Sequence, residues 1–500
     1  MKELRLTVAI SLLAILIANA QIPSIVWENN YGGNYVDETQ DIIINNNNNI
    51  VFTGYISNSG GDKFFLSELE HNGNVIWQKE LGANSLNQAQ SIKQTSDGGY
   101  IIVGFTSVTS TNLDVWVVKT DSIGNIEWEN EYGGSNEDRA YSVLQTNDNG
   151  YILVGDSHSD DGDVNVHYGN TVYPDIWIIK TDSIGNIMWE KSYGGTNEEE
   201  AYCIINSSTN SFVVCGYTSS NDIDVSGNHS ANADFWLFEI DSIGNLLNQK
   251  CFGGTNSDFA FDIKLVGDNS YVAAGSSMSN DGDVSNNYGN QDFWVLKIVD
   301  GNIEWENNFG SSQYDKAWSL DTDLDKGVIV VGEVGAADND VAGFYGGYRD
   351  YWVIKIDDFG NLVWEKNYGG SNEDRAFSVV RYPNYGYVVG GSARSDDYDV
   401  SNNLGQFDAW ILLLNNPVNI DNISSSNDMF LYPNPTKGKI TVQAEGIESI
   451  EVFDITGKHL TGFQNLSGLK ELDLSKNTKG IYIIKVTTQK GVVVEKVVLE

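Results

Sequence analysis

A phrase of about fifteen residues that returns along most of the chain limits what this sequence can fold into. Residues 364–378 (WEKNYGGSNEDRAFS) and 128–142 (WENEYGGSNEDRAYS) are identical at twelve of fifteen positions. An active site is normally assembled once, so a phrase that recurs describes how the chain is built. The copies begin 50 to 61 residues apart, at Trp27, Trp77, Trp128, Trp189, Asn248, Trp305 and Trp364.

Every copy continues with the same order of segments. A Gly-rich corner leads to an acidic residue, a strand such as AYSVLQT, a tight turn such as TNDNG and a second strand such as YILVG. A variable loop, a third strand and a turn such as DSIGN then lead into the next copy. Four short strands per repeat are typical of a β-propeller. Each third strand carries a central aromatic residue: Phe64, Trp116, Trp177, Trp236, Trp294, Trp352 and Trp410.

The two ends of the repeat region complement each other. Residues 24–30 (SIVWENN) form an outer strand with no inner partners, whereas the last copy, 374–414, stops after three strands. The N-terminal strand can therefore complete the last blade. The sequence predicts an all-β fold, a seven-bladed β-propeller of four-stranded blades over 21–414. Asn248 replaces the Trp of the other copies, which predicts a weaker outer edge there.

The N-terminus is typical of a secretory signal peptide. Residues 1–20 combine a charged start, a short apolar run and the small-x-small ending Ala18-Asn19-Ala20. The apolar run is too short for a membrane span, and no later stretch is long and apolar enough. We expect an exported chain that begins at Gln21 and has no transmembrane segment.

Charge and cysteine content narrow the function classes. Residues 21–428 hold 18 basic and 60 acidic residues, a net charge of −42, which excludes nucleic acid as a partner and favours cations. Cys203 and Cys215 would face each other across a hairpin and could form one disulfide. The alternative is that Cys203, Cys215 and Cys251 are three small buried thiols.

The strand order places the Gly-rich corners and the variable loops on one face, and the short turns on the other. Acidic residues stand where the innermost strands begin, and they could form an acidic ring around the central channel. Alternatively each carboxylate caps its own Gly-rich turn. We favour the cap because it explains why an acidic residue recurs at this position from blade to blade. These residues are Asp37, Asp138, Glu199, Asp258, Asp315 and Asp374.

Four of the variable loops have oxygen side chains at the spacing of a calcium loop, at positions 1, 3, 5, 7 and 12 in two of them. The alternative is a set of Asx turns, since no Glu occupies position 12 and Gly is mostly missing at position 6. The candidate calcium ligands are Asp161, Asp163, Asn165, Asp222, Asp224, Asp281, Asp283, Ser285, Asn287, Asp292, Asp397, Asp399, Ser401, Asn403 and Asp408. No other cofactor is expected.

Catalytic motifs are absent from the sequence. The five histidines have no metal spacing, and neither G-x-S-x-G nor H-E-x-x-H occurs. The mature chain has few arginines for a sialidase-like site, and its acidic pairs are too numerous to single out a glycosidase. We therefore expect a non-enzyme.

Composition changes after Asn415. Residues 415–428 are polar and patternless, as in a linker, and short alternating strands over 429–500 predict a small Ig-like β-sandwich. The segments YPNPTKGKIT, FDITGKHL, GIYIIKV and EKVVLE resemble the type A C-terminal sorting domain of the Bacteroidetes type IX secretion system. The resemblance implies a partner, the type IX secretion machinery, and a destination at the cell surface or in the medium. It rests on Pro433, Asn434, Pro435, Gly457, Lys458, Gly480, Tyr482 and Lys496.

The repeats also resemble the secreted propeller arrays often joined to such domains. Our leading hypothesis is an exported, non-catalytic binding module that engages a glycan or a protein through its acidic loop face. A structural adhesin or surface component is the alternative, and a polysaccharide-acting enzyme is less favoured.

Overall fold

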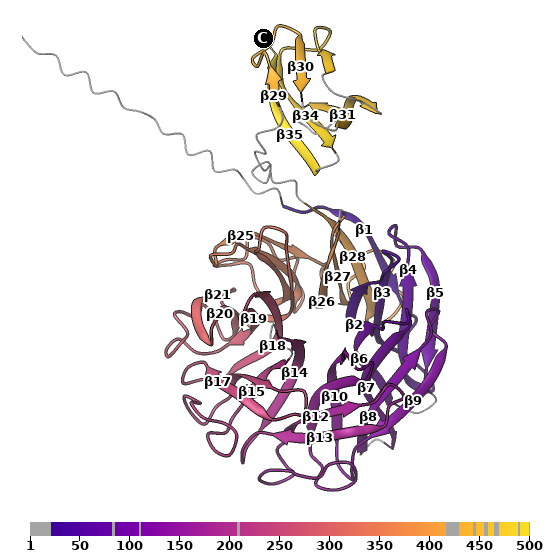
Figure 1. Ribbon diagram of the computed structural model, residues 1–500, viewed down its shortest axis with the longest axis vertical. Helices are drawn as coiled ribbons and strands as arrows, with labels where there is room; N and C mark the ends of the chain where they lie inside the picture. The colour runs from indigo at the N-terminus through magenta and orange to yellow at the C-terminus, as the bar shows by residue number, and fades with distance from the viewer. Residues whose placement is uncertain are drawn as a thin grey trace, which may run out of the picture. The chain divides into compact units, whose positions relative to one another are not determined.

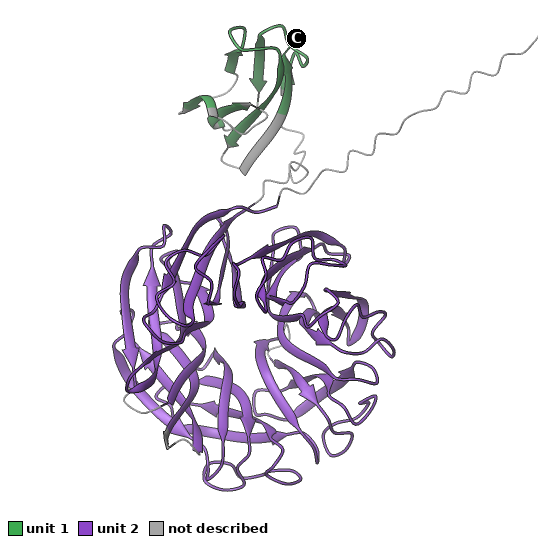
Figure 2. Ribbon diagram, turned by 180° about the vertical axis from the view of Figure 1, so that it is seen from behind, with its two compact units in different colours: residues 1–21, 417–500 green, residues 22–416 purple. Residues whose placement is uncertain are grey.

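The computed structural model of the protein describes residues 22–82, 86–109, 112–207, 211–383, 385–416, 430–443, 447–454, 459–464, 470–488 and 491–499. Every regular element in this part of the chain is a β-strand. Residues 22–416 form one compact unit, and the strands from Phe430 onward belong to a second (Figure 2). The predicted signal peptide and most of the predicted linker lie outside the described residues.

The first unit consists of seven four-stranded antiparallel sheets arranged as a ring (Figure 1). The innermost strands contact one another from blade to blade, and β26 contacts β2. They are β2 (Asp37–Ile44), β6 (Leu86–Gln94), β10 (Asp138–Gln145), β14 (Glu199–Asn206), β18 (Asp258–Gly267), β22 (Lys316–Thr322) and β26 (Asp374–Tyr382).

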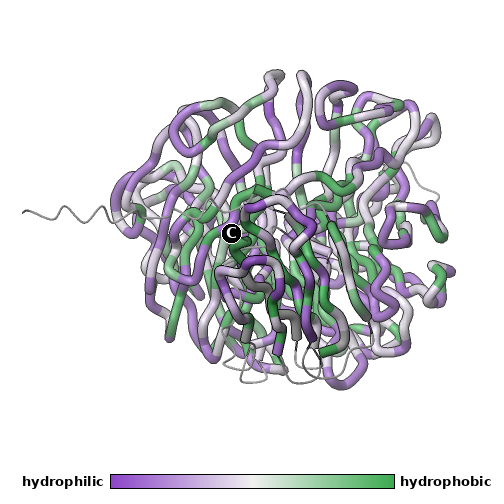
Figure 3. The backbone as a smooth tube through the Cα atoms, turned by 90° about the horizontal axis from the view of Figure 1, so that it is seen from above, coloured by the Kyte–Doolittle hydropathy of each residue, from purple (hydrophilic) through white to green (hydrophobic). Residues whose placement is uncertain are grey.

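The second and third strands of the blades form the core. The second strands are β3 (Ile50–Asn58), β7 (Tyr100–Thr109), β11 (Tyr151–Ser157), β15 (Phe212–Thr218), β19 (Ser270–Ser277), β23 (Val328–Val334) and β27 (Gly386–Ala393). The third strands are β4 (Gly61–Leu69), β8 (Asn112–Thr120), β12 (Asp175–Thr181), β16 (Asp234–Ile240), β20 (Asp292–Val299), β24 (Asp350–Ile356) and β28 (Asp408–Asn415). Their central side chains are almost all buried, so both sheet faces pack against neighbouring blades. Figure 3 shows hydrophobic residues along the strands and hydrophilic ones in the connecting loops.

The outer strands are β5 (Val75–Leu81), β9 (Ile126–Tyr132), β13 (Ile187–Tyr193), β17 (Leu246–Phe252), β21 (Asn302–Phe309), β25 (Leu362–Tyr368) and, for the last blade, β1 (Ile25–Tyr31). The prediction of a seven-bladed propeller closed by the N-terminal strand is therefore confirmed. The order of the last sheet is β1-β28-β27-β26, and β1 lies beside β28 in Figure 1.

The closing strand reproduces the side-chain bond found within other blades. The indole Nε1 of Trp410 donates to Glu28 at 2.8 Å. In the same way Trp352 donates to Glu365 at 2.8 Å within a continuous blade. The central tryptophan of the third strand is thus tied to its outer strand whether or not the two are adjacent in sequence.

Outer-strand tryptophans join each blade to the next. The ring of Trp305 lies against Gly360, in the turn between the third and fourth strands of the following blade, where a Cβ atom would come within 2.8 Å of it. Gly360 has φ of +87°, a left-handed conformation that also favours glycine. Trp27, Trp77, Trp128 and Trp189 meet Gly73, Gly124, Gly185 and Gly244 in the same way.

One junction lacks this contact. Asn248 stands where the tryptophan would be, and among the described residues no atom lies within 4 Å of the position a Cβ on Gly301 would take. A cavity of about 300 Å³ opens there, lined by Asn248, Phe252, Ile298 and Gly301 among others. The predicted weaker edge thus coincides with a gap between two blades.

We expect Asn248→Trp to fill this cavity and to raise the free energy of unfolding by about 1 kcal/mol, as cavity filling commonly does. The reciprocal change, Trp305→Asn, should lower it by about 2 kcal/mol because it opens a cavity at a regular junction. Urea unfolding of the full chain would measure both. A neutral or destabilising Asn248→Trp would contradict this account of the gap.

The second unit is a small β-sandwich of two sheets, in agreement with the prediction. One sheet has the order β29-β30-β33 and the other β32-β31-β34-β35. The strands are β29 (Phe430–Tyr432), β30 (Lys439–Gln443), β31 (Ile447–Asp454), β32 (His459–Gln464), β33 (Lys470–Asp473), β34 (Gly480–Thr488) and β35 (Gly491–Leu499). Ile440, Val452, Leu472 and Ile484 are among its buried residues.

Candidate functional site

The acidic residues that open the innermost strands cap the corners between blades. Each is buried, and each accepts a hydrogen bond from the backbone N–H four residues earlier, as Asp374 does from Gly370 at 2.8 Å. The same bond joins Asp37 to Gly33, Asp138 to Gly134, Glu199 to Gly195, Asp258 to Gly254 and Asp315 to Ser311. This geometry is that of turn caps and not of an exposed ring.

Asp374 satisfies four donors. Besides Gly370, it accepts from the backbone N–H of Arg394 at 3.0 Å and of Ser395 at 3.2 Å, and from the Ser395 hydroxyl at 2.8 Å. Burial raises its pKa to about 6, although the hydrogen bonds favour the ionised form. The cap therefore fixes the corner loop and the loop between second and third strands to each other.

We expect Asp374→Ala to lower the free energy of unfolding by about 3 kcal/mol, because several buried donors lose their acceptor. Asp182→Ala is the matched control, since Asp182 caps Ile184 and Asn186 in a solvent-exposed turn. Asp182→Ala should lower the free energy of unfolding by much less than Asp374→Ala does. Equal losses in the two denaturation curves would show that burial of the corner carboxylate is unimportant.

The variable loops fold back onto the corners through a recurring Asp-x-Asp-Val sequence. The first aspartate accepts a corner N–H: Asp281 bonds Thr255 at 2.8 Å and Asp397 bonds Ser371 at 2.7 Å. The backbone N–H of the second donates to a corner glycine, as Asp399 does to the Gly369 carbonyl at 3.1 Å. Asp161 and Asp222 match the first role, and Asp163, Asp224 and Asp283 match the second.

The later predicted loop positions each have separate partners. The amide of Asn165 donates to Glu190, and the Ser401 hydroxyl donates to Glu28 at 2.5 Å. The hydroxyl of Ser285 bonds Asn286 at 3.1 Å. Asn287 and Asn403 donate to the carbonyls of Ser277 and Ala393, both at 2.9 Å. The side chains at these positions are thus bonded to other partners and not to one another.

Within the described ranges, no three His, Cys, Asp or Glu side chains form a group placed to hold a metal ion. Calcium binding by the loops stays a prediction. All three cysteines are free thiols, although Cys203 and Cys215 lie directly opposite each other in the β14–β15 ladder.

The sixth blade has the same loop, which the sequence analysis missed. Asp338 accepts from the Ser312 N–H at 2.7 Å, and the N–H of Asp340 donates to the Gly310 carbonyl at 3.2 Å. The signal was available, because Asp-Asn-Asp-Val at 338–341 repeats the Asp-x-Asp-Val of the other four loops.

A third set of aspartates begins the third strands. Each is fully buried and accepts a backbone N–H through Oδ2, as Asp350 does from Tyr345 at 2.7 Å. Burial, opposed by this bond and reinforced by Asp374 and Asp399, raises the pKa of Asp350 to about 8. The pKa is likewise raised to about 8 for Asp175 and to about 7 for Asp292, and it is also raised for Asp234 and Asp408.

A cavity of about 600 Å³ occupies the centre of the ring and is lined by all seven innermost strands. Each of these strands has a β-bulge three residues after its acidic cap or, in the second blade, after Asn87. Bulges re-aim a side chain and are frequent beside binding sites. The bulged residues all line the cavity: Gln40, Gln90, Tyr141, Tyr202, Phe261, Trp318 and Phe377.

Five of these bulged residues form an aromatic arc that spans consecutive blades. Neighbouring ring centroids are 4.8, 4.9, 4.8 and 5.7 Å apart from Tyr141 through Tyr202, Phe261 and Trp318 to Phe377. The two glutamines occupy the remaining two blades. The channel wall therefore carries aromatic rings on one side and amides on the other.

Charged groups flank the arc. The ammonium of Lys316 lies 4.1 Å from the ring of Phe261 and 3.6 Å from that of Trp318, and burial lowers its pKa to about 8. Arg349 forms an ion pair with Glu333, which also lies 3.6 Å from Arg375. Glu38, Asp41, Lys264 and Arg375 line the cavity itself, so its wall combines aromatic rings with both signs of charge.

The arc was not predicted from the sequence. Its signal is an aromatic residue three positions after the corner acid in five copies, as in DRAYS and DRAFS. Regular alternation would not predict that position to face the channel, because the bulge sets its direction.

The sorting-domain residues come together around the last strand. The side chain of Asn434 donates to the Lys496 carbonyl at 2.6 Å and accepts from the Val498 N–H at 2.9 Å. The Tyr482 hydroxyl donates to the Thr478 carbonyl. Pro433 and Pro435 flank Asn434, and Gly480 begins β34. Gly457 and Lys458 lie outside the described residues.

Residues 430–500 match the family model described as the secretion system C-terminal sorting domain. The prediction of such a domain at this end of the chain is confirmed. Its presence indicates secretion to the cell surface or the extracellular space. In the part of the chain that the structure describes, no helix is long and apolar enough to cross a membrane.

None of the curated proteins matches the chain. Similar solved structures include the Neurospora crassa Pan2 WD40 domain, with 10% identity, 77% of this chain and 90% of that chain covered, and a TM-score of 0.42. Sqt1 from Chaetomium thermophilum has 11% identity, 95% and 100% coverage and a TM-score of 0.39. A puromycin hydrolase mutant complexed with PGG has 10% identity, 75% and 52% coverage and a TM-score of 0.39.

Proposed function

We propose that the protein is an exported, non-catalytic binding module that engages a glycan at its central channel and at the acidic loop face around it. The single observation that carries this proposal is the aromatic arc from Tyr141 to Phe377, built by a bulge in each innermost strand. Aromatic faces supply apolar contact to a ring-shaped ligand, and a few polar groups orient it.

The chemistry around the arc suits a hydroxyl-rich ligand. Gln40 and Gln90 offer both donors and acceptors across the channel from the rings. Glu38, Asp41 and Arg375 also line the cavity, so sugar hydroxyls would meet partners of either kind. The carboxylate of Glu333 is held by arginine, which favours a structural role for it over acid–base catalysis.

We further propose that a signal peptide at 1–20 and the sorting domain deliver the propeller through the type IX secretion machinery of a Bacteroidetes-type cell. The match of residues 430–500 supports this route. Deleting residues 430–500 should retain the propeller inside the outer membrane. Cell fractionation with detection of the propeller would measure this, and secretion of the truncated chain at the full-length level would contradict it.

The glycan proposal is tested by retention of the full chain on a panel of insoluble and immobilised polysaccharides. Phe377→Ala removes one ring of the arc and should weaken retention about tenfold, since one ring contact contributes about 1.4 kcal/mol. Phe359→Ala is the matched control, because Phe359 is exposed in a turn between third and fourth strands. Its retention should equal that of the unmodified chain.

Two results would contradict the proposal in different ways. Retention that is insensitive to Phe377→Ala would move glycan binding away from the channel. Failure of the unmodified chain to bind any polysaccharide would remove the glycan and favour a protein ligand or a structural role at the surface.

A further inference from the structure

Five junctions between blades bring together carboxylates from two neighbouring blades. At one of them, Asp114 with Asp163, Oδ1 of the third-strand aspartate accepts from the Asn112 amide at 3.4 Å, and the other four leave that oxygen without a donor among the described residues. At each of these four, the second aspartate of the next blade's loop bonds the corner glycine that leads into that blade. At three of them the aspartate that begins a third strand lies beside the same glycine. The four pairs are Asp175 with Asp224, Asp234 with Asp283, Asp292 with Asp340, and Asp350 with Asp399.

In each pair the third-strand aspartate carries an oxygen without a partner. Asp175, Asp234, Asp292 and Asp350 are all 0% exposed, and the Oδ1 atom of each has no hydrogen-bond partner among the described residues. Their Oδ2 atoms are bonded to backbone N–H groups. A fully buried carboxylate oxygen that lacks a donor is costly, so its recurrence at four junctions requires an explanation.

At three of the four junctions the lone oxygen lies beside the corner glycine. A Cβ atom on Gly253 would lie 2.7 Å from Oδ1 of Asp234 and 2.6 Å from Oδ2 of Asp258. The corresponding distances at Gly310 are 2.5 Å to Asp292 and 2.7 Å to Asp315. Two carboxylate oxygens from adjacent blades therefore approach one point, and only glycine leaves that point open.

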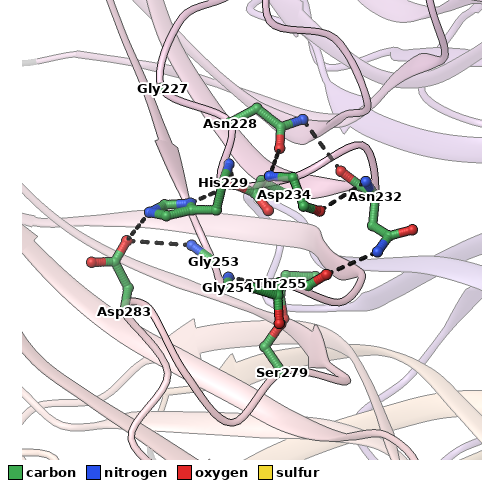
Figure 4. A network of polar contacts seen from close by, with 12 residues as sticks. Gly227, Asn228, His229, Asn232, Asp234, Gly253, Gly254, Thr255, Ser279 and Asp283 are labelled. Carbon is green, nitrogen blue, oxygen red and sulfur yellow. Dashed lines mark hydrogen bonds and ion pairs between the residues drawn. The ribbon is translucent and has the colours of Figure 1, made fainter.

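The loop aspartate reaches the same corner from the other side. The N–H of Gly253 donates to Oδ2 of Asp283 at 3.3 Å, and the Gly253 carbonyl accepts from the Asp283 N–H at 2.8 Å. Figure 4 shows Asp234 and Asp283 on opposite sides of His229. The His229 ring lies 2.6 Å from Asp234 through Nδ1 and 3.8 Å from Asp283 through Nε2.

The type of residue at the position of His229 depends on whether the loop carboxylate is present. It is the residue whose N–H donates to the third-strand aspartate, and it is Tyr168, Tyr288 and Tyr345 at the other three junctions. At the junction of the last blade with the first it is Leu404, and the first blade has no Asp-x-Asp loop. A polar ring thus accompanies the four pairs in which the third-strand aspartate is fully buried, and Leu404 replaces it where the loop carboxylate is missing.

We propose that each of these four junctions binds one calcium ion between adjacent blades. Oδ1 of the third-strand aspartate and the loop carboxylate are its side-chain ligands, and backbone carbonyls and water complete the shell. Calcium suits such a site because it takes six to eight oxygen ligands in loose geometry. Two side-chain ligands per ion are consistent with the lack of a three-residue group in the described part of the chain.

This site differs from a calcium loop within one blade. A loop site in the last blade would use Asp397, Asp399 and Asp408 together. The junction site uses Asp399 with Asp350 of the preceding blade, and it leaves Asp397 bonded to Ser371. The ion would cross-link two blades, and the proposal does not depend on the ligand of the channel.

The test is isothermal titration of calcium chloride into the full chain after removal of divalent ions with a chelator. Sodium chloride at about 150 mM screens weak binding to the acidic surface. We expect four calcium ions per chain. Asp350→Asn and Asp399→Asn should each reduce the number to three, whereas Asp397→Asn, which keeps an acceptor oxygen for Ser371, should leave four.

Thermal melting of each variant without calcium checks that it folds. If buried Asp350 does not tolerate replacement, Asp399→Asn decides alone, since Asp399 lies in a loop and is half-buried. Absence of stoichiometric binding by the unmodified chain would overturn the proposal. The proposal would also be overturned if Asp397→Asn reduced the number of bound calcium ions and Asp399→Asn did not.

Discussion

Antiparallel pairing of β1 with β28 holds the first and last blades in one ring, and the rest of the propeller depends on it. Each blade buries both faces against its neighbours, so an open ring would expose the faces of two blades at once. Six residue pairs from Ile25 to Tyr31 and the bond from Trp410 to Glu28 make the junction. The channel, with walls from all seven blades, exists only when the ring is closed.

The features that sequence predicted best are those with a large, local physical cause. A tryptophan on an outer strand packs against a glycine in a turn of the next blade, and nearly every repeat of the sequence contains both residues. The count of blades and the closing strand followed from the recurring phrase and the incomplete last copy, and the substitution of Asn248 for tryptophan predicted the weaker edge there. The corner acids were also interpretable, because a carboxylate four residues after a Gly-rich turn has backbone donors within reach.

Features that depend on two blades, or on an irregular backbone, were not predictable in this way. Trp318 faces the channel because a bulge displaces it, and a bulge leaves no residue signature of its own. Spacing grouped Asp399 with Asp408 because they share a loop, whereas the fold places Asp399 at the corner beside Asp350. A periodic sequence shows what recurs within one repeat, and it does not show which repeat supplies the neighbouring atom.

The split last blade has a consequence for biosynthesis. The strand that closes the ring is synthesised before the other strands of the propeller, but its partner β28 ends at Asn415. Nearly four hundred residues must therefore be made before the two strands can pair. Pairing over such a separation is slow, and earlier blades cannot close on themselves. The match to a sorting domain begins at residue 430, just after β28. The last strand needed for ring closure and the sorting domain are therefore neighbours in the sequence, after all the other blades.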